Sequence, residues 1–418
     1  MVHVHGLRVQ QQVAAAAGAP AEQCVVVAID TGKAEAVALV ADFTGERLCA
    51  PVTFAMNRTG ITGMVERVVA ATTDRQVKVV RCGVEASGYH LPLLTPGVLP
   101  DSWTMLELNP AHVAMQRRVN GQRSVKTDLV DATAMFDLLV SGRGHVVGQA
   151  DTAIVELAGW VHLRRSRVAL KRAIGNHLIS QMDRAFPGVS SCFHQLLGTR
   201  AGRLVIDEFT DPQRLARMGS SRFQTFARNR GVRVSANNAD KLVEAARQAL
   251  PSADAAVARE AVAADLRVMA ELQAQIAVAE EHLERLLPAT PYAVLTTTPG
   301  WATVRASLYG AGVGDPRRWS SARKIYRASG LTPSVHESAG RRRDGEISRE
   351  GSVTLRHALL ELGQGLRHHE HAARLRAAQL AAQGKHSMII WTAMANRANR
   401  IAYAMVKDQQ PYDVRRWS

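Results

Sequence analysis

Three short apolar segments in close succession restrict the fold of this chain more than any other feature of its sequence. They are rich in β-branched residues, are separated by turn residues and comprise residues 24–30 (CVVVAID), 36–42 (AVALVAD) and 51–56 (PVTFAM). Such a pattern predicts three successive strands. Residues 60–73 then carry apolar side chains at helical spacing, and the apolar runs at 77–88 and 102–109 are typical of strands. This succession predicts an α/β domain in the first part of the chain.

Most of the remaining chain is predicted to be helical. A long helix is indicated by apolar residues that repeat at gaps of three and four, namely Leu266, Met269, Leu272, Ile276, Ala279, Leu283 and Leu286. We expect residues 154–183 to form its antiparallel partner in a coiled coil. Residues 295–333 have the pattern of two short helices with a bend at Pro299 and Gly300. This pattern predicts a helix-hairpin-helix-like unit, although an ordinary helical hairpin explains it equally well.

These patterns divide the chain into five predicted segments. We expect a loose tail at 1–23, an α/β domain at 24–150, a helical coiled-coil region at 151–289, an all-α domain at 290–410 and a short tail at 411–418. Four scattered cysteines without C-x-x-C spacing indicate neither a disulfide framework nor a zinc site, which favours the reducing cytoplasm. No apolar run approaches the roughly 18 residues of a membrane-spanning helix, so no membrane partner is expected.

The charge of the chain points to a polyanionic partner. Lys and Arg outnumber Asp and Glu by 52 to 37, for a formal net charge of +15, and nucleic acid is the usual partner of so basic a protein. A GC-rich genome, which favours arginine codons, is the alternative explanation. The predicted helix at 154–183 concentrates basic residues that form either a contact with a nucleic-acid backbone or a solvated face: Arg164, Arg165, Arg167, Lys171 and Arg172.

Four acidic residues stand out against this positive background. Asp128 and Asp131 lie three positions apart at the start of a predicted helix, so their side chains project within about 60° of each other. Thr127 is a typical helix cap, and acidic residues in a first turn also favour the helix dipole, which is the structural explanation of the pair. Asp30 and Glu85, however, each follow an apolar predicted strand, where packing does not explain a carboxylate.

Carboxylates at two strand ends and on a following helix can converge on one point. Four of them are tolerated close together only with cations between them, and ligands that are all oxygen suit Mg²⁺ or Mn²⁺. Ribonuclease-H-like nucleases use this order of acids, with two metal ions that activate the attacking oxygen and stabilise the leaving oxygen of a phosphodiester. We therefore predict a mixed ribonuclease-H-like sheet with the following catalytic metal ligands: Asp30, Glu85, Asp128 and Asp131.

The motifs VAID (27–30), GVEASG (83–88) and KTDLVDA (126–132), in this order, resemble the N-terminal half of DEDD insertion-sequence transposases. These are the bridge-RNA-guided recombinases that also resemble the pilin-gene invertase. Residues 297–360 resemble their second conserved domain, and the likeness covers roughly 24–142 and 290–407. The resemblance implies a RuvC-like domain that binds two Mg²⁺ ions through the four acids, followed by a coiled coil and a helical transposase domain.

The resemblance also implies a nucleophilic serine. In the family this serine lies in a Ser-Gly-rich loop followed by basic residues, and the matching stretch ESAGRRRDGEISREG (337–351) places it at Ser338. Ala339 stands where the family more often has glycine, so this loop is expected to be stiffer. Three arginines would hold phosphate oxygens near the point of attack: Arg341, Arg342 and Arg343. Lesser candidates for the nucleophile are Ser334, Ser348 and Ser352.

Three functions remain open on the sequence. The leading hypothesis is a transposase that excises and inserts its own element by Mg²⁺-dependent strand exchange on double-stranded DNA at element ends and targets, directed by a non-coding guide RNA. The second is a Holliday-junction-type nuclease that hydrolyses with water, and the third is a non-catalytic nucleic-acid-binding scaffold. For the leading hypothesis we expect a homodimer or tetramer associated with the bacterial nucleoid, because recombination requires two duplexes to be held together.

Overall fold

The computed structural model describes residues 18–86, 88–95, 97–122, 127–147, 151–338 and 341–417. Two compact units divide the chain: one combines the residues up to Ala158 with those from Leu287 onward, and the other is Gly159–Leu286. Most of the predicted tail 1–23 lies outside the described residues, and its last three, Ala21–Gln23, form a short 3₁₀ helix, η1.

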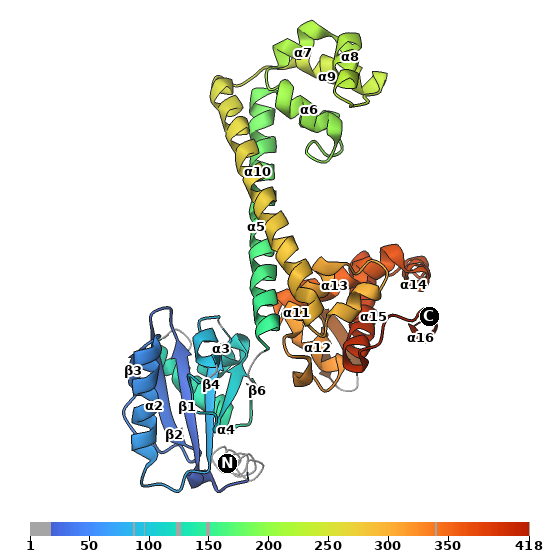
Figure 1. The fold of residues 1–418 in the computed structure, drawn as a ribbon. Helices are drawn as coiled ribbons and strands as arrows, with labels where there is room; N and C mark the ends of the chain where they lie inside the picture. Colours follow the sequence, from blue (N-terminus) through green and yellow to red (C-terminus); the bar gives the residue numbers. More distant parts are fainter. Residues whose placement is uncertain are drawn as a thin grey trace. The chain divides into compact units, whose positions relative to one another are not determined.

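A mixed sheet forms the N-terminal part of the first unit (Figure 1). Among the described residues its strands, in the order β3-β2-β1-β4-β5-β6, are β1 (Cys24–Thr31), β2 (Glu35–Asp42), β3 (Val52–Ala55), β4 (Val79–Glu85), β5 (Trp103–Leu108) and β6 (His145–Val146). The first three form the predicted antiparallel meander, whereas β4 runs parallel to β1 and β5 parallel to β4. The predicted α/β domain with a mixed sheet is confirmed, and its topology is consistent with a RuvC-like fold.

Each face of this sheet carries its own hydrophobic core. Helix α2 (Arg58–Thr72) packs its apolar stripe on one face. Helices α3 (Pro110–Val119) and α4 (Asp128–Val140) cover the other face, and most residues of α4 are buried there. The sheet is therefore the middle layer of three. Helix α4, which carries the predicted ligands Asp128 and Asp131, covers one of its faces.

The second unit is built on two long helices, α5 (Thr152–Ala185) and α10 (Ala255–Leu286). Side-chain contacts join them, such as Arg164 with Glu280, Lys171 with Gln273 and His177 with Asp265, and Arg184 contacts Asp254 just before α10. Residue numbers rise along α5 as they fall along α10, so the two helices are antiparallel, as predicted. A coiled-coil supercoil remains a prediction.

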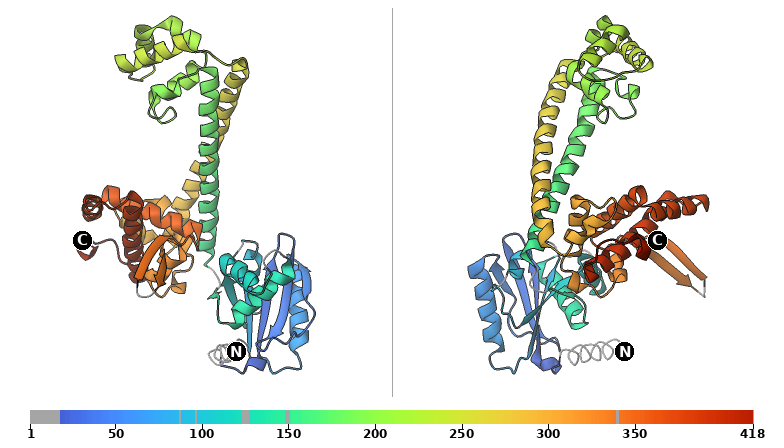
Figure 2. Two further views of the ribbon diagram at one scale, coloured as in Figure 1. Left: turned by 180° about the vertical axis from the view of Figure 1, so that it is seen from behind. Right: turned by 45° about the vertical axis from the view of Figure 1, so that its right-hand side comes forward.

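Four shorter helices connect α5 to α10 (Figure 2). They are α6 (Arg200–Glu208), α7 (Pro212–Met218), α8 (Ser220–Asn229) and α9 (Ala236–Gln248). Phe209 and Phe223 are fully buried at the centre of a core that these helices share with the end of α5. Residues 188–254 are called the tip subdomain below.

The C-terminal part of the first unit is helical except for one hairpin. Its α-helices are α11 (Thr303–Val313), α12 (Ala322–Ala328), α13 (Val353–His369), α14 (His371–Ala382), α15 (Ser387–Asp408) and α16 (Val414–Trp417). The prediction of an all-α domain is wrong, because β7 (Pro333–Ser338) and β8 (Arg341–Ile347) pair as antiparallel strands. Most residues of both strands are polar or charged, so the sequence lacks the apolar alternation by which a strand is recognised.

The predicted helix-hairpin-helix segment contains two α-helices and two 3₁₀ turns, η5 (Ala293–Thr297) before α11 and η6 (Pro316–Arg318) before α12. Gly300 lies at the predicted bend with a φ of 79°, and a Cβ atom there would lie 2.7 Å from the Gly365 carbonyl oxygen. A helix-hairpin-helix function remains a prediction. In the described part of the chain, no helix is both long and apolar enough to cross a membrane.

Candidate active site

Asp30 and Glu85 lie at neighbouring strand ends on one face of the sheet. β1 and β4 are adjacent and parallel, and the residues just before these two acids are paired in register. Side chains alternate along a strand, so Asp30 shares the face of Ala28, which packs in the core beneath α4. On β4, Gly83 lies against Leu139 of α4, so Glu85, two residues on, belongs to the same face. The strand geometry therefore brings the first two predicted acids together.

The two acidic residues on α4, Asp128 and Asp131, differ in their exposure to solvent. Thr127 caps the helix, since its hydroxyl accepts a hydrogen bond from the Val130 N–H at 3.3 Å. Asp128 is exposed, whereas Asp131 is only 3% exposed. Arg117 of α3 donates a hydrogen bond to Asp131 Oδ1 at 2.5 Å and forms an ion pair with it. A buried carboxylate needs such a partner, so Arg117 neutralises Asp131 within the fold.

The four acids fit a divalent cation by the chemistry of their donor atoms. Carboxylate oxygens are the ligands that Mg²⁺ and Mn²⁺ prefer, and both strand-end acids lie on the face that α4 covers. Within the described ranges, however, no group of three or more His, Cys, Asp or Glu side chains is arranged to hold a metal ion. Arg117 occupies Oδ1 of Asp131, which is one of the carboxylate oxygens that a metal ion would use.

The predicted nucleophile Ser338 lies on β7 of the β7–β8 hairpin, and this hairpin is seen in the C-terminal part of the chain in Figure 2. Ser338 is the last residue of β7 and is paired in register with Arg341, the first residue of β8, while Arg342 and Arg343 follow along β8. The backbone alone places these residues, because the side chains of residues 335–344 lie outside the described part of the structure. The hairpin thus holds Ser338 and Arg341 opposite each other on paired strands.

The basic face predicted on α5 is partly engaged within the second unit. Arg164 Nε donates a hydrogen bond to Glu280 at 2.7 Å, and Lys171 donates to the Gln273 side chain. Arg172 is exposed, whereas the other four predicted residues of this face are half-buried. The helix therefore offers fewer free cations than its sequence suggests, and its contact with nucleic acid remains a prediction.

A partly buried ionic contact in the first unit has no counterpart among the sequence predictions. His90 Nε2 and an Arg318 guanidinium nitrogen each lie 3.0 Å from an oxygen of the Glu107 carboxylate. Burial alone would raise the pKa of Glu107, but the hydrogen bond from His90 and the positive charge of Arg318 lower this pKa below its ordinary value. Arg318 is 211 residues away in the chain, so no local pattern links the partners. Likewise, no local pattern in the sequence indicates that Arg117 contacts Asp131.

Two family models match this chain. One, described as a transposase, matches residues 27–187, which include the four acids. The other, described as the transposase IS116/IS110/IS902 family, matches residues 292–378, which include Ser338 and the hairpin. The chain belongs to the IS110 family of DEDD transposases. The tip subdomain of this family member lies outside both matched ranges.

Two curated relatives of this chain are described as transposases. The putative transposase y4pF/y4sB of Sinorhizobium fredii is 32% identical over 147 residues, which is 34% of this chain and 38% of the relative. The probable family 20 transposase of Pseudomonas aeruginosa is 28% identical over 121 residues, 28% of this chain and 36% of the relative. The match therefore spans less than two fifths of the length of either relative.

Proposed function

We propose that this IS110-family transposase excises and inserts its own insertion sequence by cutting and rejoining DNA through a covalent phosphoserine intermediate. The observation that supports the proposal is the placement of the acids. Asp30 and Glu85 share the face of the sheet that α4 covers, Asp128 and Asp131 lie in the first turn of α4, and all four are within the range matched by the transposase model. Helix caps and strand ends alone do not account for two carboxylates side by side on that face.

The acids would hold two Mg²⁺ ions, with Mn²⁺ as a substitute, as is typical of the DEDD family. When bound, the ions would activate the attacking oxygen and stabilise the leaving oxygen of a phosphodiester. The chain's own contribution is to fix the carboxylates. Thr127 sets the start of α4 through its cap, and Arg117 holds Asp131 in one orientation.

Ser338 would supply the nucleophile for strand exchange. Its hydroxyl oxygen forms a bond to phosphorus, loses its proton to a basic group of the site, and displaces a bridging oxygen of the strand, which leaves as a free hydroxyl. In the second step the hydroxyl of another strand attacks the phosphoserine and releases the serine. One phosphodiester is broken and one is formed, so the exchange needs no external energy source. Charge-assisted contacts to the phosphate would come from three residues: Arg341, Arg342 and Arg343.

Nucleic acid would be recognised in two ways. The net charge of +15 favours contacts with the DNA backbone, including those from the exposed Arg172. A non-coding guide RNA would select the target by base pairing, as the family resemblance implies. A homodimer or tetramer would hold element and target duplexes together.

A denaturing gel tests the serine mechanism directly. Full-length protein is incubated with Mg²⁺, RNA transcribed from the element's non-coding flank and end-labelled DNA that carries an element end. We expect a labelled band shifted by the mass of the protein for wild type and its absence for Ser338→Ala and Asp128→Ala. Ser334→Ala is the matched control on the same strand β7, since Ser334 donates to the Glu346 carbonyl oxygen at 3.2 Å, and this variant should keep the band.

Two alternatives predict different gels. A hydrolytic junction nuclease would cut the DNA without any adduct, and Ser338→Ala would leave its cleavage unchanged. A non-catalytic scaffold would neither cut nor form an adduct, and the acid substitutions would change only stability. A shifted band that survives Ser338→Ala and disappears in Ser334→Ala would reassign the nucleophile to Ser334.

A further inference from the structure

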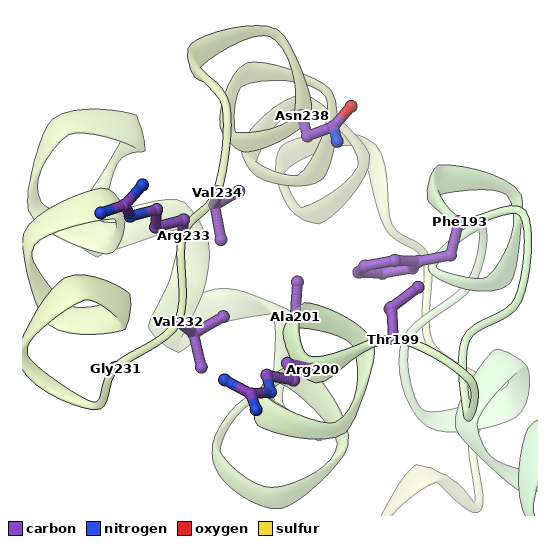
Figure 3. Close-up of a pocket in the computed structure, with 9 residues that line it drawn as sticks. All are labelled: Phe193, Thr199, Arg200, Ala201, Gly231, Val232, Arg233, Val234 and Asn238. Carbon is purple, nitrogen blue, oxygen red and sulfur yellow. The ribbon is translucent and has the colours of Figure 1, made fainter.

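The tip subdomain contains a cavity of about 540 Å³ (Figure 3). It lies between the start of α6 and the segment 231–234 that joins α8 to α9, and Phe193 and Asn238 complete its wall. This volume falls within the range of about 300–1,000 Å³ that is usual for ligand sites. Because the subdomain lies outside both family models, family membership assigns no role to the cavity.

Two arginines without an acidic partner in the described part of the chain give the wall of the cavity a positive charge. Arg200 and Arg233 are exposed, come from two different segments of the wall, and make no hydrogen bond or ion pair with the described residues. Arg214 and Arg230, which do not line the cavity, both pair with Glu208. None of the residues that line the cavity is acidic. Two free guanidinium groups without a carboxylate are suited to phosphate groups.

The interior of the cavity is apolar and carries one aromatic ring. Figure 3 shows the Phe193 ring directed into the space between Ala201 and Asn238. Val232 and Val234 line the opposite wall, and the Asn238 amide is exposed at the edge. An aromatic face binds a base without sequence preference, and an amide offers both a donor and an acceptor to a base edge. A base that remains stacked inside a duplex cannot enter such a cavity.

We propose that the tip subdomain binds single-stranded nucleic acid, with one unstacked base against Phe193 and the flanking phosphates on Arg200 and Arg233. The strand comes either from RNA of the element or from DNA that is unpaired during strand exchange. Both present the same chemistry, and the experiment separates them. This inference goes beyond the proposed function and does not depend on Ser338 or on the acids.

Fluorescence anisotropy with labelled oligonucleotides of about 12 nucleotides measures the affinity of full-length protein for single-stranded RNA, single-stranded DNA and duplex DNA. We expect Arg200→Ala with Arg233→Ala to weaken single-strand binding at least about tenfold and duplex binding much less. The slope of log K against log salt should fall by about 1.4, since each phosphate contact on a single strand contributes about 0.7. The preferred oligonucleotide identifies the source of the strand.

The matched control is Arg222→Ala with Arg228→Ala, which removes the same charge from exposed positions of α8 that do not line the cavity. If this control weakens binding as much as the cavity variant does, the effect is general electrostatics and the proposal is wrong. Equal binding by wild type and the cavity variant overturns it as well. Thermal unfolding of each variant checks that the subdomain is intact.

A second measurement tests the aromatic contact. Photo-crosslinking with oligonucleotides that carry 4-thiouridine or 4-thiothymidine should label the peptide that contains Phe193. Phe193→Leu keeps an apolar side chain but removes the aromatic face, so it should weaken single-strand binding several-fold and lower the crosslink yield. Crosslinks confined to other parts of the chain would contradict the proposal. The phosphoserine gel is unaffected by these outcomes, because it reports on Ser338 alone.

Discussion

The guanidinium of Arg117 lies 2.5 Å from the buried carboxylate of Asp131, so a cation of the chain neutralises a predicted metal ligand. Arg117→Ala leaves this carboxylate unpaired, and breaking such a pair costs about 3 kcal/mol. Because a divalent ion would then be the best remaining partner of Asp131, we expect Mg²⁺ to raise the melting temperature of the variant more than that of wild type. Thermal unfolding with and without Mg²⁺ measures both effects.

Two further variants make this test specific. Arg118→Ala removes an exposed neighbouring charge on the same helix and should behave like wild type in stability and in its response to Mg²⁺. Asp131→Asn removes the carboxylate itself, so Mg²⁺ should stabilise it less than wild type. An equal response to Mg²⁺ in wild type and Arg117→Ala would separate Arg117 from the metal site and leave it a purely structural partner.

The sequence predicts the strands, the acids and the long helices because local patterns specify them. VVVAID ends in an acid after an apolar run, and the Leu and Ile repeat of α10 has a helical period, so each is visible without any partner. Arg117 is 14 residues from Asp131 in the chain, and no local sequence pattern identifies it as the partner of this carboxylate. Its contact exists only because α3 packs beside α4. The hairpin around Ser338 was missed because its strands are polar, and the free arginines at the tip were missed because exposure and pairing are properties of the fold.

Acidification should weaken the first unit through Glu107. The pKa of its carboxyl is lower in the folded chain than its ordinary value of 4.5, so its contribution to the free energy of unfolding is complete above about pH 4.5 and is lost as pH falls through the folded value. Glu107→Gln lacks this contribution. It should be less stable near neutral pH by about 1–3 kcal/mol and should lose less stability on acidification.

Urea unfolding between about pH 7 and pH 3 measures this difference. Asp101→Asn, at an exposed position just before β5, is the control and should follow wild type across the range. Parallel stability curves for wild type and Glu107→Gln would show that the ionic contact with His90 and Arg318 does not contribute in solution.

The pairing of α5 with α10 is testable by reversing one ion pair. Arg164 and Glu280 are 24% and 37% exposed, so their contact is worth about 0.5–1 kcal/mol. Glu280→Arg should destabilise the second unit by at least this amount, because it places two cations together, and adding Arg164→Glu should restore most of the loss. A double variant no more stable than Glu280→Arg would mean that the two side chains do not meet across the helix pair in solution.

Gly83 determines how closely α4 can approach the strand that ends in Glu85. A Cβ atom at this position would lie 2.4 Å from Leu139 Cδ1, so Gly83→Ala should destabilise the domain by about 1–3 kcal/mol through overpacking. Leu139→Ala alone should cost about 2–5 kcal/mol because it opens a cavity. The double variant should be more stable than the sum of the two losses implies, since the new methyl group fills part of that cavity. Gly63→Ala is the control, because a Cβ atom at this position of α2 would meet open space. This variant should be neutral or stabilising by up to about 1 kcal/mol.

Urea unfolding measures these losses. If the losses for Gly83→Ala and Leu139→Ala are strictly additive, then α4 does not pack on β4 at this point. The conclusion that Glu85 lies on the face covered by α4 then loses its support.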